Sequence, residues 1–194
     1  PMKLHLDGKF IGKATVAAVV YLLCFGIVMA VLPVRPFWND EWRLIYNIKF
    51  KTPAQLWGRL DLLQECPRVY LILIKKITAA FDYSYTALRL PPLIISCFSF
   101  LLLFYLVKRI FDKGSIYGYL WMLIIISSQT FTDYMVQVKQ YEMDIFLCLL
   151  VFWQYLELLD IARDGVGSRL RFLLLCATVL VVPYFSYMYP ISFA

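Results

Sequence analysis

Long apolar stretches separated by short polar segments divide this chain of 194 residues. They approach or reach the roughly 18–20 residues that cross the hydrocarbon core of a bilayer as a helix. They cover residues 14–34, 90–111, 115–132, 142–159 and 170–190. Because a helix pairs its own backbone groups in lipid, the pattern predicts an all-α, polytopic membrane protein with about five transmembrane helices.

Residues 69–81 form a further apolar segment that is too short to span and carries Lys75 and Lys76 at its centre. We expect it to be a helix that lies in the membrane interface, with lysines that snorkel or contact anionic headgroups. The topology agrees: the basic N-terminal tail and the basic loops 108–113 and 160–171 share one side only if this segment does not cross. The positive-inside rule makes that side cytoplasmic, together with the N-terminus.

This topology places residues 35–89 on the outer face of the membrane as one long segment. The segment is rich in tryptophan and tyrosine, which favour the headgroup region. Thr52 followed by Pro53 indicates the start of a short helix. We therefore expect several juxtamembrane helices lying flat on the membrane. We interpret residues 1–194 as a single module and as the N-terminal piece of a longer protein.

Composition narrows the class of protein. The chain is 62% hydrophobic and 16% charged, with a mean hydropathy of +0.71, which leaves a very apolar soluble helical bundle as a remote alternative. The net charge of +6 comes from residues in loops, as membrane topology requires, so no nucleic-acid partner is expected. The five cysteines show no metal-ligand or disulfide spacing.

Acidic residues stand at several predicted outer helix ends. Asp40 and Glu41 follow the first apolar run, Glu65 lies in the outer segment, and Asp144 enters the fourth predicted span. Carboxylates beside hydrocarbon are costly and are commonly functional, so these groups could line one cavity. A carboxylate within reach of an acceptor hydroxyl can act as a general base, and carboxylates are ligands for hard divalent metals.

Cations are available on the same side. Lys139, Arg68 and Arg89 all fall in the outer segments of the predicted topology. A leaving phosphate would be stabilised by such a cation or by a bound metal. The combination favours group transfer at the outer membrane surface.

Each acidic residue also has a simpler interpretation. Asp40 and Glu41 could cap a short helix and complement its dipole. On the sequence pattern alone, this capping role has about the same weight as a functional role. Glu65 could be an ordinary loop charge, and Asp144 an N-terminal helix charge.

Four stretches carry a family resemblance through their order. They are Asp40-Glu41 after the first helix, Glu65–Tyr70 with a proline and an aromatic residue, Phe81–Pro91 with its Ala-Leu-Arg-Leu-Pro sequence, and Gln137–Asp144 with a lysine, a tyrosine and an aspartate. In this order the chain resembles the N-terminal part of the GT-C membrane glycosyltransferases, in particular the group of protein O-mannosyltransferases and the aminoarabinose transferase of lipid A. Cys66, Arg68, Val138 and Tyr83 depart from the family pattern.

The resemblance implies roles for individual residues. Asp40 would be the catalytic base, Glu41 would support it, and Asp144 would be the second essential carboxylate. Glu65 would be the ligand of a divalent metal ion if one is used, and no nucleotide cofactor is needed. The residues assigned to substrate binding are Lys139, Tyr141, Arg89 and Arg68.

The implied reaction is transfer of a hexosyl or pentosyl group from a polyisoprenyl-phosphate donor, with inversion, on the outer face of the cell membrane. The partners would be that donor, membrane lipids and a hydroxyl acceptor on a lipid, glycan or protein. A non-catalytic membrane protein, such as a lipid or sugar-lipid binder, a flippase or a transporter, is the main alternative. A family member that binds lipid-linked sugars without turning them over is another. Charges in mid-span would favour transport, and they are scarce here.

Overall fold

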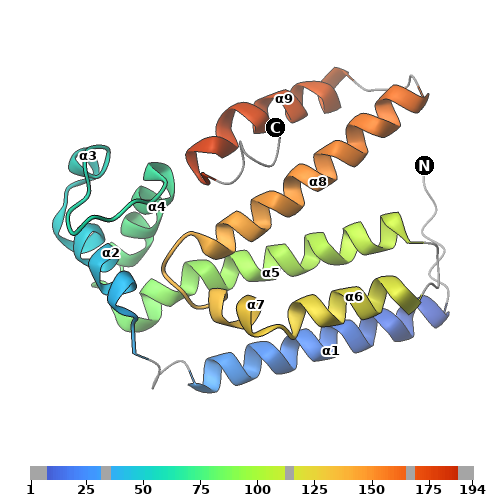
Figure 1. Cartoon of the computed structure of the whole chain (residues 1–194), viewed down its shortest axis with the longest axis horizontal. Helices are drawn as coiled ribbons and strands as arrows, with labels where there is room; N and C mark the ends of the chain where they lie inside the picture. The colour runs from blue at the N-terminus through green and yellow to red at the C-terminus, as the bar shows by residue number, and fades with distance from the viewer. Residues whose placement is uncertain (1–7, 32–35, 112–115, 165–168, 188–194) are drawn as a thin grey trace.

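The computed structural model describes residues 8–31, 36–111, 116–164 and 169–187. Throughout these ranges the regular structure is helical and contains no strand, which confirms the predicted all-α class. The elements are α1 (Gly8–Val31), α2 (Asn39–Phe50), α3 (Pro53–Leu56), α4 (Arg68–Ala79), α5 (Tyr85–Ile110), α6 (Ile116–Ile126), α7 (Gln129–Tyr134), α8 (Tyr141–Asp164), α9 (Arg169–Val181) and a 3₁₀ turn, η2 (Val182–Tyr184) (Figure 1).

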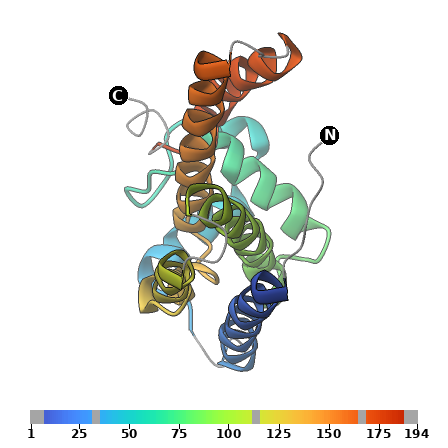
Figure 2. The same ribbon diagram turned by 90° about the vertical axis from the view of Figure 1, so that its right-hand side faces the viewer.

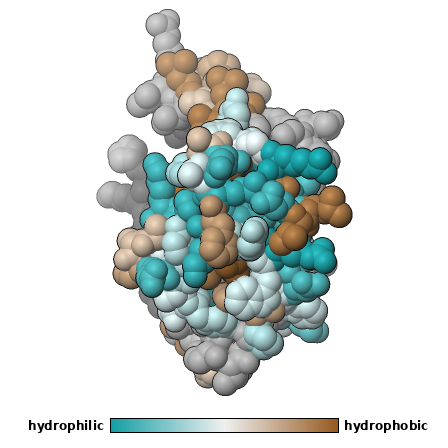
Figure 3. Space-filling model, turned by 90° about the vertical axis from the view of Figure 1, so that its left-hand side faces the viewer, coloured by the Kyte–Doolittle hydropathy of each residue, from teal (hydrophilic) through white to brown (hydrophobic). Residues whose placement is uncertain are grey.

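The helix α5 lies at the centre of the molecule. Figures 1 and 2 show it between α8 on one side and the pair α1 and α6 on the other, while α9 lies outside α8. The short helices α2, α3 and α4 gather at the end where α5 and α8 begin. Viewed from that end, the surface is hydrophilic over much of its middle, with hydrophobic residues exposed between and beside the polar ones (Figure 3).

Two helices in the described ranges are long and apolar enough to cross a membrane, Tyr85–Ile110 and Tyr141–Arg163. They correspond to the predicted spans 90–111 and 142–159. Ser84 begins the first of them by accepting a hydrogen bond from the backbone N–H of Ala87 at 3.3 Å, which is the usual role of an N-cap serine.

The predicted span 115–132 is not one helix. α6 ends at Ile126 after 11 residues, and α7 starts anew at Gln129. Ser127 and Ser128 account for the break, since their hydroxyls donate to carbonyls of the preceding turn and Ser128 accepts from the N–H of Phe131 at 3.2 Å. At 1.5 Å per residue, α6 alone is too short to cross a bilayer.

The predicted spans 14–34 and 170–190 are helical over part of their length. α1 occupies Gly8–Val31, and α9 runs for 13 residues before the turn η2. Pro183 lies at the start of η2, and a proline that lacks an N–H cannot continue the α-helical ladder. Residues 32–34 and 188–190 of these predicted spans lie outside the described residues.

The predicted short helices between the first two spans are present. Thr52 caps α3 by accepting from the N–H of Gln55 at 3.3 Å, and α4 covers most of residues 69–81. Lys75 has a specific role: its ammonium donates to the carbonyl of Ile48 at 2.7 Å and to the hydroxyl of Tyr83 at 3.0 Å. It therefore stabilises the carboxyl end of α2, whereas the position of these helices on a membrane stays a prediction.

Two apolar clusters hold the helices together. One joins α2 and α4 to the first turns of α5 and α8, and the other joins α1, α5 and α6. At the opposite end of α5 and α8, the guanidinium of Arg109 contacts Glu157 at 2.5 Å and Asp160 at 2.6 Å. α5 and α8 are thus linked at both ends.

Large apolar side chains also cover the outside of the bundle. Leu180 is 71% exposed, Ile27 64% and Ile124 60%, on three different helices. Apolar surface of this kind marks an interaction with lipid or with another protein. It agrees with membrane association.

The contact between α5 and α6 provides a test of the packing. A Cβ atom added at Gly118 would lie 2.7 Å from Cδ2 of Phe111 and 2.9 Å from Cγ1 of Val107. Gly118→Val should therefore destabilise the protein by about 1–3 kcal/mol, measured by thermal unfolding in detergent. Gly26→Ala is the control, because nothing lies within 4 Å of its added Cβ; equal loss in both variants would contradict this packing.

Candidate functional site

An ion pair between Asp40 and Lys139 forms the exposed part of the site. The lysine Nζ lies 3.0 Å from Oδ2 of Asp40, although the residues are 99 positions apart. Asp40 is 59% exposed at the start of α2, and Lys139 is largely buried. The hydrogen bond and charge of Lys139 lower the pKa of the Asp40 carboxyl below its ordinary value, with a smaller contribution from Arg43. Asp40 is therefore ionised at neutral pH.

Glu41, the next residue, points into the protein and is 1% exposed. Its Oε2 accepts from the backbone N–H of Trp38 at 3.0 Å, and its Oε1 accepts from the N–H of Val138 at 2.9 Å. The first bond is the capping interaction of a helix N-terminus. The capping role that the sequence allowed for the acidic pair thus belongs to Glu41, while Asp40 remains open to the cavity.

Arg89 lies behind Glu41 with no exposed surface. Its Nη1 is 3.7 Å from Oε1 of Glu41 and donates to the carbonyl of Val136 at 2.6 Å. The guanidinium lies 4.4 Å from the ring centre of Phe37 and 4.8 Å from that of Tyr85. These contacts make Arg89 a support of the site wall, in contrast to the predicted direct contact with substrate.

The loop between α7 and α8 carries Lys139 and is held at three points. Arg89 binds the carbonyl of Val136, Glu41 binds the N–H of Val138, and Tyr70 donates to the carbonyls of Val138 and Lys139 at 3.0 and 3.1 Å. Tyr70 is fully buried in α4. Lys139 is thereby positioned by three helices that are distant in sequence.

Asp144 lies one turn into α8 and is partly exposed. Its carboxylate accepts a hydrogen bond from the hydroxyl of Ser186, just past the turn η2. Asp144 thus lies where the ends of α8 and α9 meet.

The segment around Cys66 joins the same region. The Cys66 thiol is buried and donates to Oε1 of Gln140 at 3.2 Å, and its carbonyl accepts from Tyr187 at 3.1 Å and from Arg68 at 3.3 Å. Burial raises the pKa of this thiol, and the charge of Asp144 adds to the effect. Cys66 is therefore a packed structural thiol.

Glu65 is exposed beside this segment. Among the described residues, no three histidine, cysteine, aspartate or glutamate side chains come together in a way that could hold a metal ion. The role of Glu65 as a metal ligand stays a prediction.

Two cavities adjoin at this end of the molecule. The polar cavity, of about 420 Å³, is lined by Asp40, Glu41, Lys139 and Tyr141 among others. The apolar groove, of about 700 Å³, has Asp144, Gln140 and Tyr187 at one end and then follows one face of α8. The remaining residues that line this groove are Tyr134, Tyr141, Ile145, Cys148, Leu149 and Phe152.

Tyr134 and Tyr141 belong to both cavities. Their ring centres are 4.7 Å apart with an interplanar angle of 34°. The tilted pair of rings therefore forms the boundary between the polar cavity and the apolar groove. A substrate that occupied both would pass these two rings.

The predicted site residues thus separate into two groups. Asp40, Glu41, Lys139 and Tyr141 share the polar cavity, and Asp144 lies in the adjoining groove. Arg68, Arg89 and Glu65 line neither of these two cavities.

Sequence reasoning missed several residues of the site. Tyr134 and Gln140 belong to the stretch 134–144, whose polar and aromatic character between two apolar runs was a usable signal. Ser186 and Tyr187 lie more than forty residues further on, and no local pattern connects them to Asp144.

Comparison with family models, with curated proteins and with solved structures gives no match. The function is therefore argued from the residues of this chain.

The Glu41–Arg89 pair can be tested by its effect on folding. Glu41→Ala leaves the Arg89 guanidinium buried beside no carboxylate and removes two backbone hydrogen bonds, so it should destabilise the protein by about 3–5 kcal/mol. Asp40→Asn is the matched control and should leave the unfolding temperature nearly unchanged, because Asp40 is exposed. Similar thermal stability of the Glu41→Ala and wild-type proteins in detergent would contradict the supporting role.

Proposed function

We propose that this chain is part of a membrane glycosyltransferase that moves a sugar from a polyisoprenyl-phosphate donor to a hydroxyl acceptor. The observation that carries the proposal is the ionised, exposed Asp40, paired with Lys139 in a polar cavity that adjoins an apolar groove. A polar reaction site beside an apolar channel suits a donor with a charged head and a hydrocarbon tail.

Asp40 is suited to act as the general base. The Oδ2 atom of Asp40 accepts a hydrogen bond from Lys139, while its Oδ1 atom has no hydrogen-bond partner within the described part of the chain. In the proposed reaction Oδ1 takes the proton of the acceptor hydroxyl, and the acceptor oxygen forms a bond to the anomeric carbon. The bond between that carbon and the phosphate oxygen breaks, and the electron pair leaves with the lipid phosphate. Attack opposite the leaving group inverts the anomeric centre.

Lys139 serves two groups in this proposal. Its ammonium has three donors, and one of them binds Asp40 at 3.0 Å. It can hold the carboxylate in its charged form and meet the negative charge that develops on the phosphate. Tyr70 and Glu41, which anchor the loop, fix its distance from Asp40.

The groove supports the donor class. Past Asp144 it is lined by Ile145, Cys148, Leu149 and Phe152 on successive turns of α8. An isoprenoid chain along α8 would bury apolar surface and direct its phosphate past Tyr134 and Tyr141 toward Lys139. A divalent metal at Glu65, or the cation Arg68, would add positive charge at the Asp144 end.

The membrane arrangement belongs to the same proposal. α5 and α8 cross the cell membrane, α1, the α6–α7 pair and α9 complete a five-span bundle, and α2, α3 and α4 lie on the outer surface. The N-terminus is then cytoplasmic. The acceptor hydroxyl belongs to a lipid, a glycan or a protein on the outer face.

One observation favours the alternative of a non-catalytic binding or transport protein. Glu142 in the first turn of α8 has no exposed surface, and it has no ion-pair partner among the described residues. Ser99 of α5 lies beside it. Buried carboxylates inside a membrane bundle are common in ion and proton pathways. Transport that depends on Glu142 and continues in the Asp40→Asn variant would establish this alternative.

Asp40→Asn is the direct test of the transferase. Membranes that contain the full protein would be supplied with a panel of radiolabelled polyprenyl-phosphate sugars. Label should pass to lipid, glycan or protein in the wild type and fall by about 10²–10⁴-fold in the variant. Asp61→Asn is the matched control, since Asp61 forms a similar exposed pair with Lys51 at 3.0 Å outside the cavity. Full activity of Asp40→Asn would refute the assignment of the base.

The pH profile tests the pairing of Asp40 with Lys139. Because Lys139 lowers the pKa of Asp40, Lys139→Gln should raise that pKa and move the acidic limb of the kcat/KM profile to higher pH. Lys51→Gln should leave this limb in place. A variant that lost rate equally at every pH would show that Lys139 does not act through the ionisation of Asp40.

A further inference from the structure

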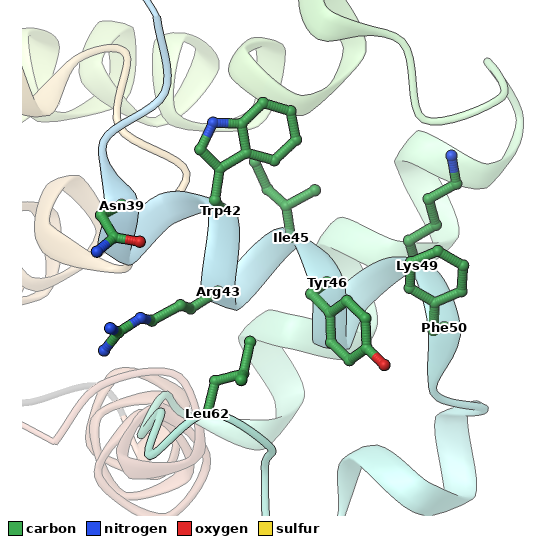
Figure 4. A pocket seen from close by; sticks show the side chains of 8 residues that line it. All are labelled: Asn39, Trp42, Arg43, Ile45, Tyr46, Lys49, Phe50 and Leu62. Carbon is green, nitrogen blue, oxygen red and sulfur yellow. The ribbon is translucent and has the colours of Figure 1, made fainter.

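A third cavity, of about 560 Å³, follows the exposed face of α2 (Figure 4). Trp42, Tyr46 and Phe50 stand four residues apart on this face and are 56%, 46% and 65% exposed. The rings of Tyr46 and Phe50 are 4.9 Å apart. Three large aromatic side chains are thus exposed on one face of a short surface helix, and together they form an apolar patch.

The loop between α3 and α4 extends this surface. Leu62 and Leu63 have φ values of 60° and 55°, in the left-handed region that is unfavourable for residues other than glycine. They are nevertheless 51% and 85% exposed. Leu62 lies across the cavity from α2, opposite Arg43 and Tyr46 (Figure 4). Backbone strain that presents two leucines outward is typical of a contact made with another molecule.

The cavity is also lined by a cation without a direct ion-pair partner in the described ranges. The Arg43 side chain lines the cavity and forms no hydrogen bond or ion pair with any described residue. Lys49 also lines this cavity without an ion pair among the described residues, and its ammonium lies 5.9 Å from the ring centre of Phe50. Lys51 and Lys139, by contrast, are paired with Asp61 and Asp40. A partly buried guanidinium favours a phosphate or a carboxylate as its partner.

The cavity lies next to the proposed reaction site. Asn39 lines both this cavity and the polar cavity that contains Asp40. Arg43 follows Asn39 by one helical turn and contributes to the electrostatic environment of Asp40. A molecule held at Arg43 would therefore have its polar part next to the carboxylate and its apolar part over Tyr46, Phe50 and Leu62.

From this arrangement we propose that the α2 cavity binds an anionic amphiphile of the membrane, with its phosphate or carboxylate at Arg43. This molecule is the sugar acceptor, a statement that rests on the proposed function. A soluble acidic glycan would use Arg43 but would leave Phe50, Leu62 and Leu63 exposed. An acceptor with a hydrocarbon part covers them.

Binding is measured on the full protein in nanodiscs that contain phosphatidylcholine and phosphatidylglycerol. Native mass spectrometry should show phosphatidylglycerol retained in preference to phosphatidylcholine. Arg43→Gln should reduce this preference about tenfold, the loss of one charge-assisted hydrogen bond. Phe50→Ala should weaken retention of both lipids. Arg59→Gln is the matched control and should change neither, because Arg59 is exposed and lies outside the cavity.

Three results would overturn the lipid site. They are absence of a preference for the anionic lipid, equal losses in Arg43→Gln and Arg59→Gln, and equal displacement by water-soluble glycerol phosphate or an acidic oligosaccharide. The first two results would show that binding reflects only the general surface charge. The third result would show that the site recognises a headgroup or a glycan without a hydrocarbon chain.

Transfer assays separate this inference from the proposed function. With an anionic lipid acceptor, Arg43→Gln should raise KM for the acceptor about tenfold and leave kcat nearly unchanged. Arg43-dependent lipid binding without transfer from any donor would refute the transferase and leave the lipid site standing. Transfer to a water-soluble acceptor, unaffected by Arg43→Gln, would refute this inference and leave the transferase standing.

Discussion

The buried interaction between Glu41 and Arg89 is the constraint on which the rest of the site depends. A carboxylate and a guanidinium without solvent contact are tolerated only when their remaining polar atoms are bound. Glu41 meets this condition through the N–H groups of Trp38 and Val138. Within the described residues, Arg89 meets it at Nη1 and Nη2, which donate to the carbonyls of Val136 and Pro36, but not at its buried Nε. Satisfying these two groups brings together the start of α2, the first turn of α5 and the loop before α8. Removing either partner would release all three.

The two neighbouring acidic residues have different roles because their side chains point in different directions. Successive residues on a helix point about 100° apart, so when Glu41 turns inward to cap α2, Asp40 faces the cavity. The loop fixed by Glu41 also presents Lys139, which then pairs with Asp40 at 3.0 Å. One buried carboxylate thus positions the counter-ion of the exposed one. In the proposed transferase, the structural and chemical roles of the pair are separate but linked.

The surroundings of Asp40 are divided by polarity. Tyr134 and Tyr141 separate the polar cavity from the groove along α8, and Asn39 connects that cavity to the aromatic face of α2. Two apolar surfaces therefore approach one ionised carboxylate from different helices. Such an arrangement suits two amphiphilic substrates, a lipid-linked donor along α8 and an anionic acceptor along α2, with the reacting atoms in the polar space between them.

Apolar periodicity and turn chemistry by themselves determined the helical class, the helices α5 and α8, and the short helices of the outer segment, since these depend on local preferences. Local sequence also marked Asp40, Lys139 and Asp144 as polar residues at helix ends. Tertiary contacts decided which carboxylate is buried, that Arg89 supports Glu41, that Tyr70 holds the loop of Lys139, and that Ser186 meets Asp144. These contacts join residues separated by 42 to 97 positions. No local pattern encodes such pairings, because they follow from how whole helices pack and from the cost of leaving buried polar groups unbound.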